Sequence, residues 1–220
     1  MNMNPKMKQN MRPNDPHCIG LILDGGHGTR KYTKGKHSPD RSLYEGEWAR
    51  EIVSRLSVDL KAIGFDVRIL VPEDNDIRLS ERVRRANKIM SENPDKKWYY
   101  ISIHCNAAGS QGMWMDARGW CVYVSNGASA ESRELAQAMY QVANEYGLRG
   151  NRSVPKERYW QANFTVITDT WMPAILTENM FQDNRQDCEF LKSEKGKQTI
   201  LNLHTIGICR FFGIPHSVRN

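Results

Sequence analysis

Short, almost wholly apolar runs alternate along this chain with longer segments whose apolar residues recur every three or four positions. Such runs have the length and composition of strands that are buried on both faces of a sheet. They span residues 18–23, 65–71, 98–104, 119–125, 165–168 and 173–177. The helical segments span residues 44–63, 78–90, 130–146 and 195–212. This alternation predicts a single α/β domain with a mostly parallel, twisted central sheet of about six strands and helices on both faces.

Residues 1–16 differ from the rest of the chain, because they are polar and contain three prolines. We expect them to form a flexible N-terminal tail, followed by one folded domain over residues 17–220. The tail has no apolar stretch of the kind found in secretory signal peptides. The apolar runs of the domain are strand-sized and too short to cross a bilayer, so no stable membrane insertion is expected.

Charge and cysteine usage narrow the class of protein further. The formal net charge is +6 and the basic residues are dispersed along the chain, which gives no continuous basic face for a nucleic acid. The five cysteines are odd in number, and no two have the C-x-x-C spacing. We therefore expect buried free thiols rather than a disulfide framework or a thiolate metal site.

Three chemically active side chains follow the predicted strands. His27 comes after the first strand, His104 ends the strand over 98–104, and Glu178 follows the strand over 173–177. Ligands of open α/β sheets bind beyond the carboxyl ends of the strands, so these residues are placed to converge. Two histidines and a carboxylate in such a position indicate a hydrolytic zinc site.

A catalytic zinc ion takes three protein ligands, and Glu45 and Glu47 compete for the third position. At about 100° per residue, Glu45 lies in line with Trp48 and Ile52 on the apolar stripe of its helix, whereas Glu47 is turned roughly 200° away. A carboxylate on a buried face needs a partner or a metal. Glu45 also lies in the first helical turn, where the helix dipole favours an anion. We therefore select Glu45 as the third zinc ligand.

Other polar residues have simpler interpretations. Asp24 is a possible ligand, but its place before two glycines favours a role in a turn. The segment Gly25–Gly28 lacks the spacing and the lysine of a phosphate-binding loop. Four further histidines lie in polar segments, in the middle of a helix or near the C-terminus, and we do not expect them to bind metal: His17, His37, His204 and His216.

Five short motifs together resemble the ordered signature of a known family. They are Leu23–Gly28, Leu43–Glu47, Ser80–Asn87, Ile101–Ala107 and Pro173–Asn184. In this order they are similar to the zinc-dependent N-acetylmuramoyl-L-alanine amidases of the Amidase_3 type, and the resemblance covers about residues 18–213. It implies that residues 17–220 form a catalytic amidase domain, that His27, Glu45 and His104 hold one Zn²⁺ ion, and that Glu178 is the catalytic glutamate.

The resemblance also implies the reaction, which is hydrolysis of the amide between N-acetylmuramic acid and L-alanine in peptidoglycan. Asn106, Arg149 and Trp160 are our candidates for contacts with this substrate, and Arg152 and Arg158 are further arginines that are able to pair with its carboxylates. The chain departs from the family at Gly25, where a proline is usual, and the segment 149–162 matches no family motif.

The biological setting is an expectation built on the resemblance. A basic chain of this size with no signal peptide resembles a phage endolysin, a monomer that leaves the cytoplasm through a membrane lesion and acts on the cell wall. The alternative setting is a periplasmic bacterial enzyme. The alternative activity is that of a zinc carboxypeptidase or aminoacylase, which would use the same constellation on a free peptide or an acyl amino acid.

Overall fold

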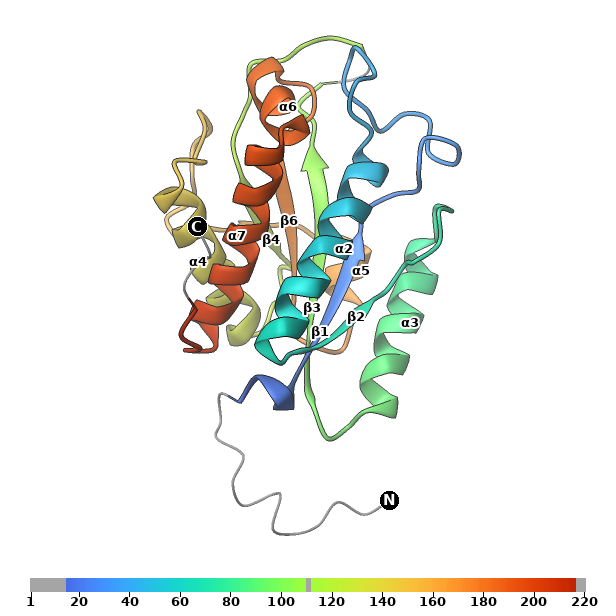
Figure 1. Cartoon of the computed structure of the whole chain (residues 1–220), viewed down its shortest axis with the longest axis vertical. Coiled ribbons are helices and arrows are strands. Elements are labelled where there is room, and N and C mark those ends of the chain that lie inside the picture. Colours follow the sequence, from blue (N-terminus) through green and yellow to red (C-terminus); the bar gives the residue numbers. More distant parts are fainter. Residues whose placement is uncertain (1–14, 110–111, 217–220) are drawn as a thin grey trace.

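A six-stranded sheet with the order β2-β1-β3-β6-β4-β5 forms the centre of the molecule (Figure 1). The computed structural model describes residues 15–109 and 112–216. The strands are β1 (Ile19–Gly25), β2 (Asp66–Ile69), β3 (Lys97–Asn106), β4 (Cys121–Val124), β5 (Trp160–Gln161) and β6 (Ala174–Phe181). All neighbouring pairs are parallel except β4 and β6, which are antiparallel. The predicted α/β fold with a mostly parallel sheet of about six strands is therefore confirmed.

Helices cover both faces of this sheet. The larger hydrophobic core lies between one face and the helices α2 (Glu45–Ile63), α4 (Ala130–Glu145), α6 (Arg185–Lys192) and α7 (Glu194–Phe211). The smaller core lies on the opposite face, beneath α3 (Leu79–Glu92) and α5 (Thr165–Thr168). Alternate residues of β1 enter the two cores: Leu21 and Leu23 join the larger one and Ile22 the smaller one. A strand buried on both faces is therefore apolar throughout.

Helix α2 has the structure that its pattern predicts. Trp48, Ile52 and Leu56 are buried along one stripe of the helix. The helix ends at Gly64, whose φ of 112° lies in the left-handed region, and the Gly64 N–H donates to the carbonyls of Leu60 and Lys61. Glycine adopts this conformation without steric cost, which makes it a common helix terminator.

Two local predictions were wrong. Residues 165–168 form the single helical turn α5 and not a strand, although they are rich in β-branched residues. Val166 and Ile167 are both buried in the smaller core, and a strand would point these neighbours to opposite faces. The sixth strand is instead β5, Trp160–Gln161, within a segment expected to be a loop.

At the N-terminus, residues 1–14 of the predicted tail lie outside the described residues. The described chain begins with Asp15, whose side chain caps the short 3-10 helix η1 (Pro16–Cys18). The predicted domain boundary at residue 17 falls within η1, the first helix of the described residues. Within residues 15–109 and 112–216, none of the helices combines the length and the apolar character that crossing a bilayer requires.

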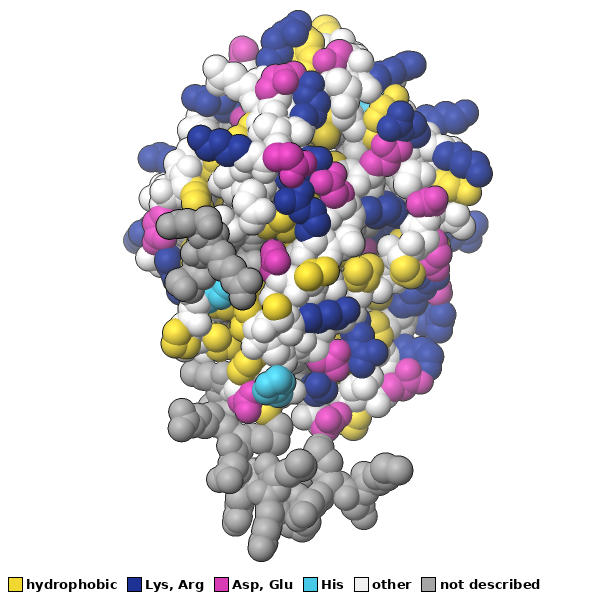
Figure 2. Space-filling view, viewed as in Figure 1, with side chains coloured by type: hydrophobic (Ala, Val, Ile, Leu, Met, Phe, Trp, Pro, Cys, Tyr) yellow, Lys and Arg dark blue, Asp and Glu magenta, His cyan; other side chains and the backbone are white. Residues whose placement is uncertain are grey.

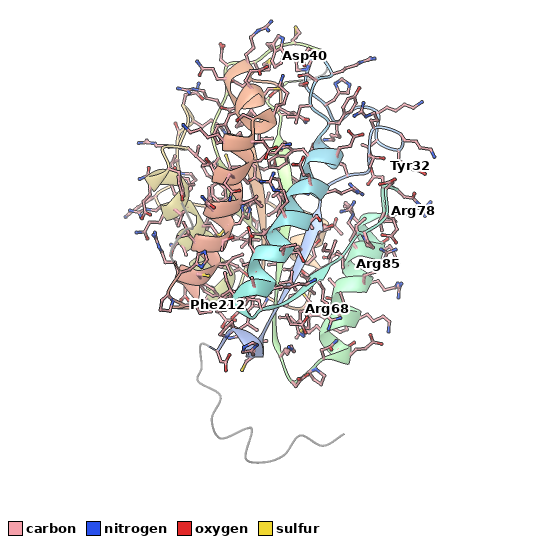
Figure 3. The ribbon with its side chains drawn as sticks, in the orientation of Figure 1. Tyr32, Asp40, Arg68, Arg78, Arg85 and Phe212 are labelled. Atoms are coloured by element: carbon pink, nitrogen blue, oxygen red, sulfur yellow. The ribbon has the colours of Figure 1, made fainter. Side chains whose placement is uncertain are left out.

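The labelled residues of Figure 3 show which parts of the chain lie at each end of the molecule. Tyr32 and Asp40 belong to the long loop that precedes α2; in Figure 3, Asp40 lies at the upper end and Tyr32 on the right in the upper half, whereas Arg68 and Phe212 lie toward the lower end. The carboxyl ends of the parallel strands β1 and β3 point to that upper end. Figure 2 shows basic and acidic side chains interspersed over this face of the molecule.

Candidate active site

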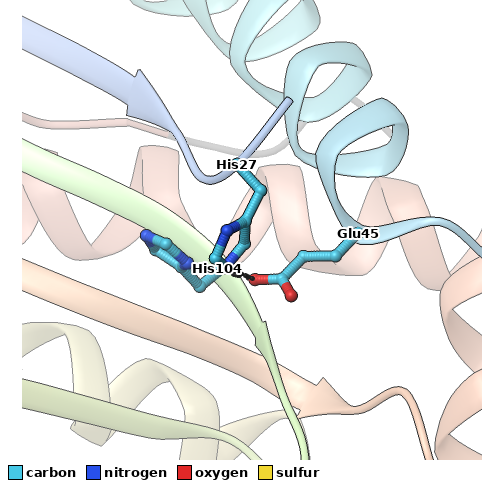
Figure 4. A group of neighbouring side chains, drawn as sticks. All are labelled: His27, Glu45 and His104. Atoms are coloured by element: carbon cyan, nitrogen blue, oxygen red, sulfur yellow. Dashed lines mark hydrogen bonds and ion pairs between the residues drawn. The ribbon is translucent and has the colours of Figure 1, made fainter. Parts of the chain in front are cut away.

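His27, Glu45 and His104 meet at the carboxyl ends of β1 and β3, where α2 begins (Figure 4). The Glu45 carboxylate points toward both imidazole rings. Its Oε1 atom lies 3.0 Å from Nδ1 of His104 and 3.5 Å from Nε2 of His27. The three residues come from three different segments of the chain, so the fold has brought them together.

The geometry of this cluster fits a tetrahedral metal ion. One nitrogen or oxygen atom from each of the three residues lies within 4.8 Å of the other two. Ligands held about 2.0–2.1 Å from a tetrahedral zinc ion are roughly 3.3 Å from one another, which matches the two distances to Glu45. Two imidazoles and one carboxylate also form a donor set that zinc accepts in hydrolytic enzymes, with the fourth position left for water. The residues present therefore fit the metal that the family resemblance implies.

Glycines allow the three segments to approach so closely. A Cβ atom on Gly26 would lie 2.3 Å from Cε1 and 2.4 Å from Nδ1 of the His104 ring, so only glycine lets the loop after β1 rest on that ring. A Cβ atom on Gly46 would lie 1.9 Å from the Gly28 carbonyl oxygen, so glycine also lets the start of α2 contact the same loop. These contacts explain two of the glycines in the motifs Leu23–Gly28 and Leu43–Glu47.

Replacing Gly26 with alanine should therefore weaken zinc binding. The added methyl group overlaps the His104 ring, and the ring or the loop that carries His27 must move. We expect the dissociation constant for zinc to rise about tenfold or more, as for other changes that misplace a ligand. Competition with a chromogenic chelator measures this constant. The control is Gly127→Ala, because a Cβ atom there has no neighbour within 4 Å. An unchanged constant for Gly26→Ala would contradict the proposed contact.

The electrostatics of the cluster centre on Glu45, which is only 2% exposed. Burial by itself opposes ionisation, but the hydrogen bond with His104 and the charges of His27 and His104 hold the pKa of Glu45 below its ordinary value. The Cys105 backbone N–H donates to Oε1, and the Gln182 side-chain amide donates to Oε2. Glu45 is therefore held as an anion, the form that binds a metal. Glu47 is turned away, as helix phase predicts, and it pairs with Arg30.

Glu178 lies beside His104 on the neighbouring strand. The two residues are directly paired in the β3–β6 register, so their side chains project from the same face of the sheet about 4.8 Å apart at the backbone. Burial raises the pKa of Glu178 to about 7; the nearby charges of His104, Lys36 and Arg152 oppose this rise, and that of Glu45 adds to it. Its Oε2 atom has no hydrogen-bond partner among the described residues. A carboxyl with this pKa and a free oxygen is suited to accept and return a proton near neutral pH.

The three predicted substrate contacts occupy different places. Asn106 ends β3, and its side-chain oxygen accepts a hydrogen bond from the Ala107 N–H. Trp160 is half-buried in β5, which pairs with β4. Arg149 lines a hollow beside α4, and no residue of the His27–Glu45–His104 cluster contributes to that hollow. The structure therefore brings Asn106 to the end of the strand that carries His104, but it does not bring Arg149 to the cluster.

Among the arginines of segment 149–162, Arg152 lies nearest to the chemistry. Its guanidinium stands 5.3 Å from the centre of the Trp160 ring and donates to Sγ of Cys121 at 3.0 Å. Cys121 pairs with Glu178 in the antiparallel register of β4 and β6. Segment 149–162 contains three arginines and matches no family motif, so the sequence gives no reason to prefer one of them. Only the contacts that the folded segment makes with β4 distinguish Arg152 from the other two.

A cavity of about 400 Å³ lies against the long loop before α2, and none of His27, Glu45 and His104 is among the residues that line it. Lys36 and His37 line it from that loop, and Gln182 and Asp183 line it from the end of β6. Gln182 also donates to Glu45, so this side chain links the lining of the cavity to the cluster. The sequence motif that contains Gln182 gave no indication that this residue contacts Glu45.

Comparisons with known proteins agree with this geometry. The family model described as N-acetylmuramoyl-L-alanine amidase matches residues 21–210. The chain is 32% identical over 201 residues to the N-acetylmuramoyl-L-alanine amidase CwlM of Bacillus licheniformis, an alignment that covers 89% of this chain and 70% of that protein. It is 26% identical over 199 residues to the endolysin of Bacillus phage SPP1, covering 87% of this chain and 65% of that protein. The chain thus spans about two thirds of the length of these relatives.

The fold has close counterparts among solved structures. The crystal structure of an N-acetylmuramoyl-L-alanine amidase from Clostridium difficile 630 superposes with a TM-score of 0.72 at 25% identity, covering 90% of this chain and 98% of that one. Together with the family match, this similarity confirms the resemblance that the five motifs indicate. The chain therefore belongs to the N-acetylmuramoyl-L-alanine amidase family.

Proposed function

We propose that this protein is a zinc-dependent N-acetylmuramoyl-L-alanine amidase, which hydrolyses the amide between N-acetylmuramic acid and L-alanine in peptidoglycan. The observation that carries the proposal is the convergence of His27, Glu45 and His104 beside the buried carboxyl of Glu178 in a member of this family. The proposed catalytic domain is residues 17–220, and the proposed cofactor is one zinc ion.

Each residue has a defined part in the proposed reaction. His27, Glu45 and His104 would hold the zinc ion, which supplies Lewis acidity that lowers the pKa of a water molecule and polarises the substrate carbonyl. Glu178 takes a proton from the attacking water and then gives it to the nitrogen of L-alanine as the amide bond breaks. Its burial supports this role, because a base with a pKa near neutrality also serves as the acid in the second step. Gln182 orients Glu45 through its amide.

Replacing Arg152 with glutamine should shift the pH profile of the reaction. The positive charge of Arg152 lowers the pKa of Glu178, so its removal raises that pKa, and more of the base is protonated at a given acidic pH. We expect the acid limb of kcat/KM to move to higher pH, with little change on the alkaline side. The control Arg133→Gln removes an exposed arginine of α4 and should leave the limb in place. A limb that stays in place in Arg152→Gln would contradict this electrostatic link.

Mass spectrometry of digested muropeptides tests the proposed bond specificity. An amidase releases whole stem peptides with a free L-alanine amino terminus and leaves N-acetylmuramic acid without its peptide. Release of single amino acids from the stem would instead support the carboxypeptidase activity, and cleavage of simple acyl amino acids alone would support an aminoacylase. Either of these results without free stem peptides would overturn the proposal.

The proposed setting rests on the relatives. We propose that the protein acts on the cell wall as a monomer and that it is released from the cytoplasm as a phage-type lysin. The similarity to the SPP1 endolysin supports this setting, and the similarity to bacterial amidases leaves the periplasmic alternative open to test. Gel filtration with light scattering measures the oligomeric state, and a stable dimer would contradict the monomer.

A further inference from the structure

Four buried polar side chains lie beneath the proposed metal site and have no part in the reaction described above. Asp24 ends β1, Arg82 projects from α3, and Tyr100 and Ser102 lie on β3; none is more than 2% exposed. We call these four residues the Asp24 network. Arg82 belongs to the motif Ser80–Asn87, which contributes neither a proposed metal ligand nor the catalytic glutamate.

Hydrogen bonds satisfy both carboxylate oxygens of Asp24. Arg82 Nη1 donates to Oδ1, the Tyr100 hydroxyl donates to Oδ2 at 2.6 Å, and the Ser102 hydroxyl donates to Oδ2 at 3.3 Å. The interpretation of Asp24 as a turn residue was therefore wrong, because Asp24 belongs to a strand and is buried in an ion pair. A buried ion pair of this kind is weak evidence for a role in stability, because apolar residues of similar volume often stabilise a fold as well.

The network reaches the proposed metal ligands by two routes. Ser102 Oγ lies 3.1 Å from Nε2 of His104, and the other ring nitrogen, Nδ1, faces Glu45. Arg82 Nη1 also donates to the Gly25 carbonyl at 2.8 Å, and Nη2 donates to the His27 carbonyl at 3.3 Å. The same guanidinium thus holds Asp24 and the loop that carries His27.

The hydrogen bonds from His104 through Ser102 to Asp24 have one consistent direction. The Ser102 hydroxyl gives its only proton to Asp24, so its oxygen is left to accept a hydrogen bond from His104. The Nε2 atom of His104 then carries a proton toward Ser102, and Nδ1, which forms the hydrogen bond with Glu45, is the nitrogen that would release its proton when a metal binds. Histidine ligands of metals generally donate the other ring N–H to a polar partner, which fixes the ring orientation and makes the ligand more basic.

We propose that Asp24 acts through Ser102 as a positioning residue for His104, holding the ring with Nε2 protonated and Nδ1 directed to the metal, and that Arg82 ties this arrangement to the loop of His27. The proposal rests on the proposed zinc site, and it assigns a role to the motif Ser80–Asn87. It requires no contact between the Asp24 network and the substrate.

The test compares zinc affinity in purified metal-free protein. Ser102→Ala removes the acceptor for the His104 N–H, and we expect the zinc dissociation constant, measured by chelator competition, to rise about 10- to 100-fold. The matched control is Ser57→Ala, which removes a buried hydroxyl of α2 and should leave the constant unchanged. Equal affinity in Ser102→Ala and the wild type would overturn the proposal.

A second readout separates positioning from general stability. In the zinc-loaded wild type, we expect a slowly exchanging, downfield Nε2–H proton on His104 in NMR spectra of protein with labelled histidine. In Ser102→Ala this proton should exchange faster and move upfield, whereas a purely structural role for Ser102 would leave it unchanged. The signal is assigned by its loss in His104→Gln. An unchanged signal in Ser102→Ala would overturn the proposal.

A double variant tests whether Asp24 acts through Ser102. If it does, Asp24→Asn weakens zinc binding, and adding it to Ser102→Ala weakens binding by less than the product of the two single effects. If the effects of the two substitutions on the zinc dissociation constant simply multiply, the proposed connection from Asp24 through Ser102 to His104 is overturned. Should Asp24→Asn fail to fold because Arg82 loses its partner, the two measurements on Ser102→Ala decide the matter.

A wild-type protein that binds no zinc would overturn the proposed function itself, whereas tight wild-type binding that Ser102→Ala leaves intact would overturn this inference alone.

Discussion

Glu178→Gln is expected to lose nearly all turnover while keeping its zinc ion and its fold. Glutamine has almost the same shape as the protonated glutamic acid, but it neither accepts the proton of the attacking water nor returns one to the leaving nitrogen. Loss of a general base typically lowers kcat by about 10²- to 10⁴-fold. The measurement is the rate at which L-alanine amino termini appear in purified peptidoglycan, together with the zinc content of the variant.

The fold should tolerate this change, because the buried carboxyl contributes little to stability. Burial raises the pKa of Glu178 to about 7, so its ionised form is disfavoured in the folded protein, and Oε2 has no partner in the described structure that glutamine would lose. Glu189→Gln, which alters an exposed glutamate of α6, is the matched control and should keep full activity. Near-normal turnover in Glu178→Gln would remove Glu178 from the mechanism and leave the zinc site untouched.

His27→Ala should lose zinc and, with it, the reaction. Two ligands remain in this variant, Glu45 and His104, and a catalytic zinc site needs three protein ligands. We expect a zinc content near zero after dialysis, as measured by atomic emission, and no detectable release of stem peptides. The His27 side chain is 25% exposed, so its loss removes little buried surface and the variant should remain folded. The control His216→Ala changes an exposed histidine and should retain both zinc and activity. Stoichiometric zinc in His27→Ala would show that the ion is bound elsewhere.

The main features of the fold were predictable because its strands are buried on both faces. The apolar runs that became β1, β3 and β6 are unambiguous. They place His27 just after β1 and His104 and Glu178 near the carboxyl ends of β3 and β6, although these two strands continue past them to Asn106 and Phe181. Helix phase also distinguished Glu45 from Glu47, because an amphipathic helix such as α2 has only one buried stripe. These predictions rest on periodicity, which a local stretch of sequence contains.

Features that depend on distant partners were not predictable. Asp24 is followed by two glycines and looked like a turn residue, but its partners Arg82 and Tyr100 lie 58 and 76 positions away in the sequence. The short elements α5 and β5 were also missed, since each contains a turn or less of regular structure and packing decides its form. For the same reason, no local pattern separated Arg152 from Arg149.

The central claim is that one zinc ion at the His27–Glu45–His104 cluster is needed to cleave the bond between N-acetylmuramic acid and L-alanine.

Titration of the metal-free protein with zinc, followed by digestion of purified peptidoglycan, tests that claim most directly. New L-alanine amino termini should increase with added zinc, reach a plateau at one equivalent per chain, and disappear when a chelator removes the metal, with no new reducing ends at any point. Cleavage at full rate by metal-free protein, or the appearance of reducing ends in place of L-alanine amino termini, would contradict it.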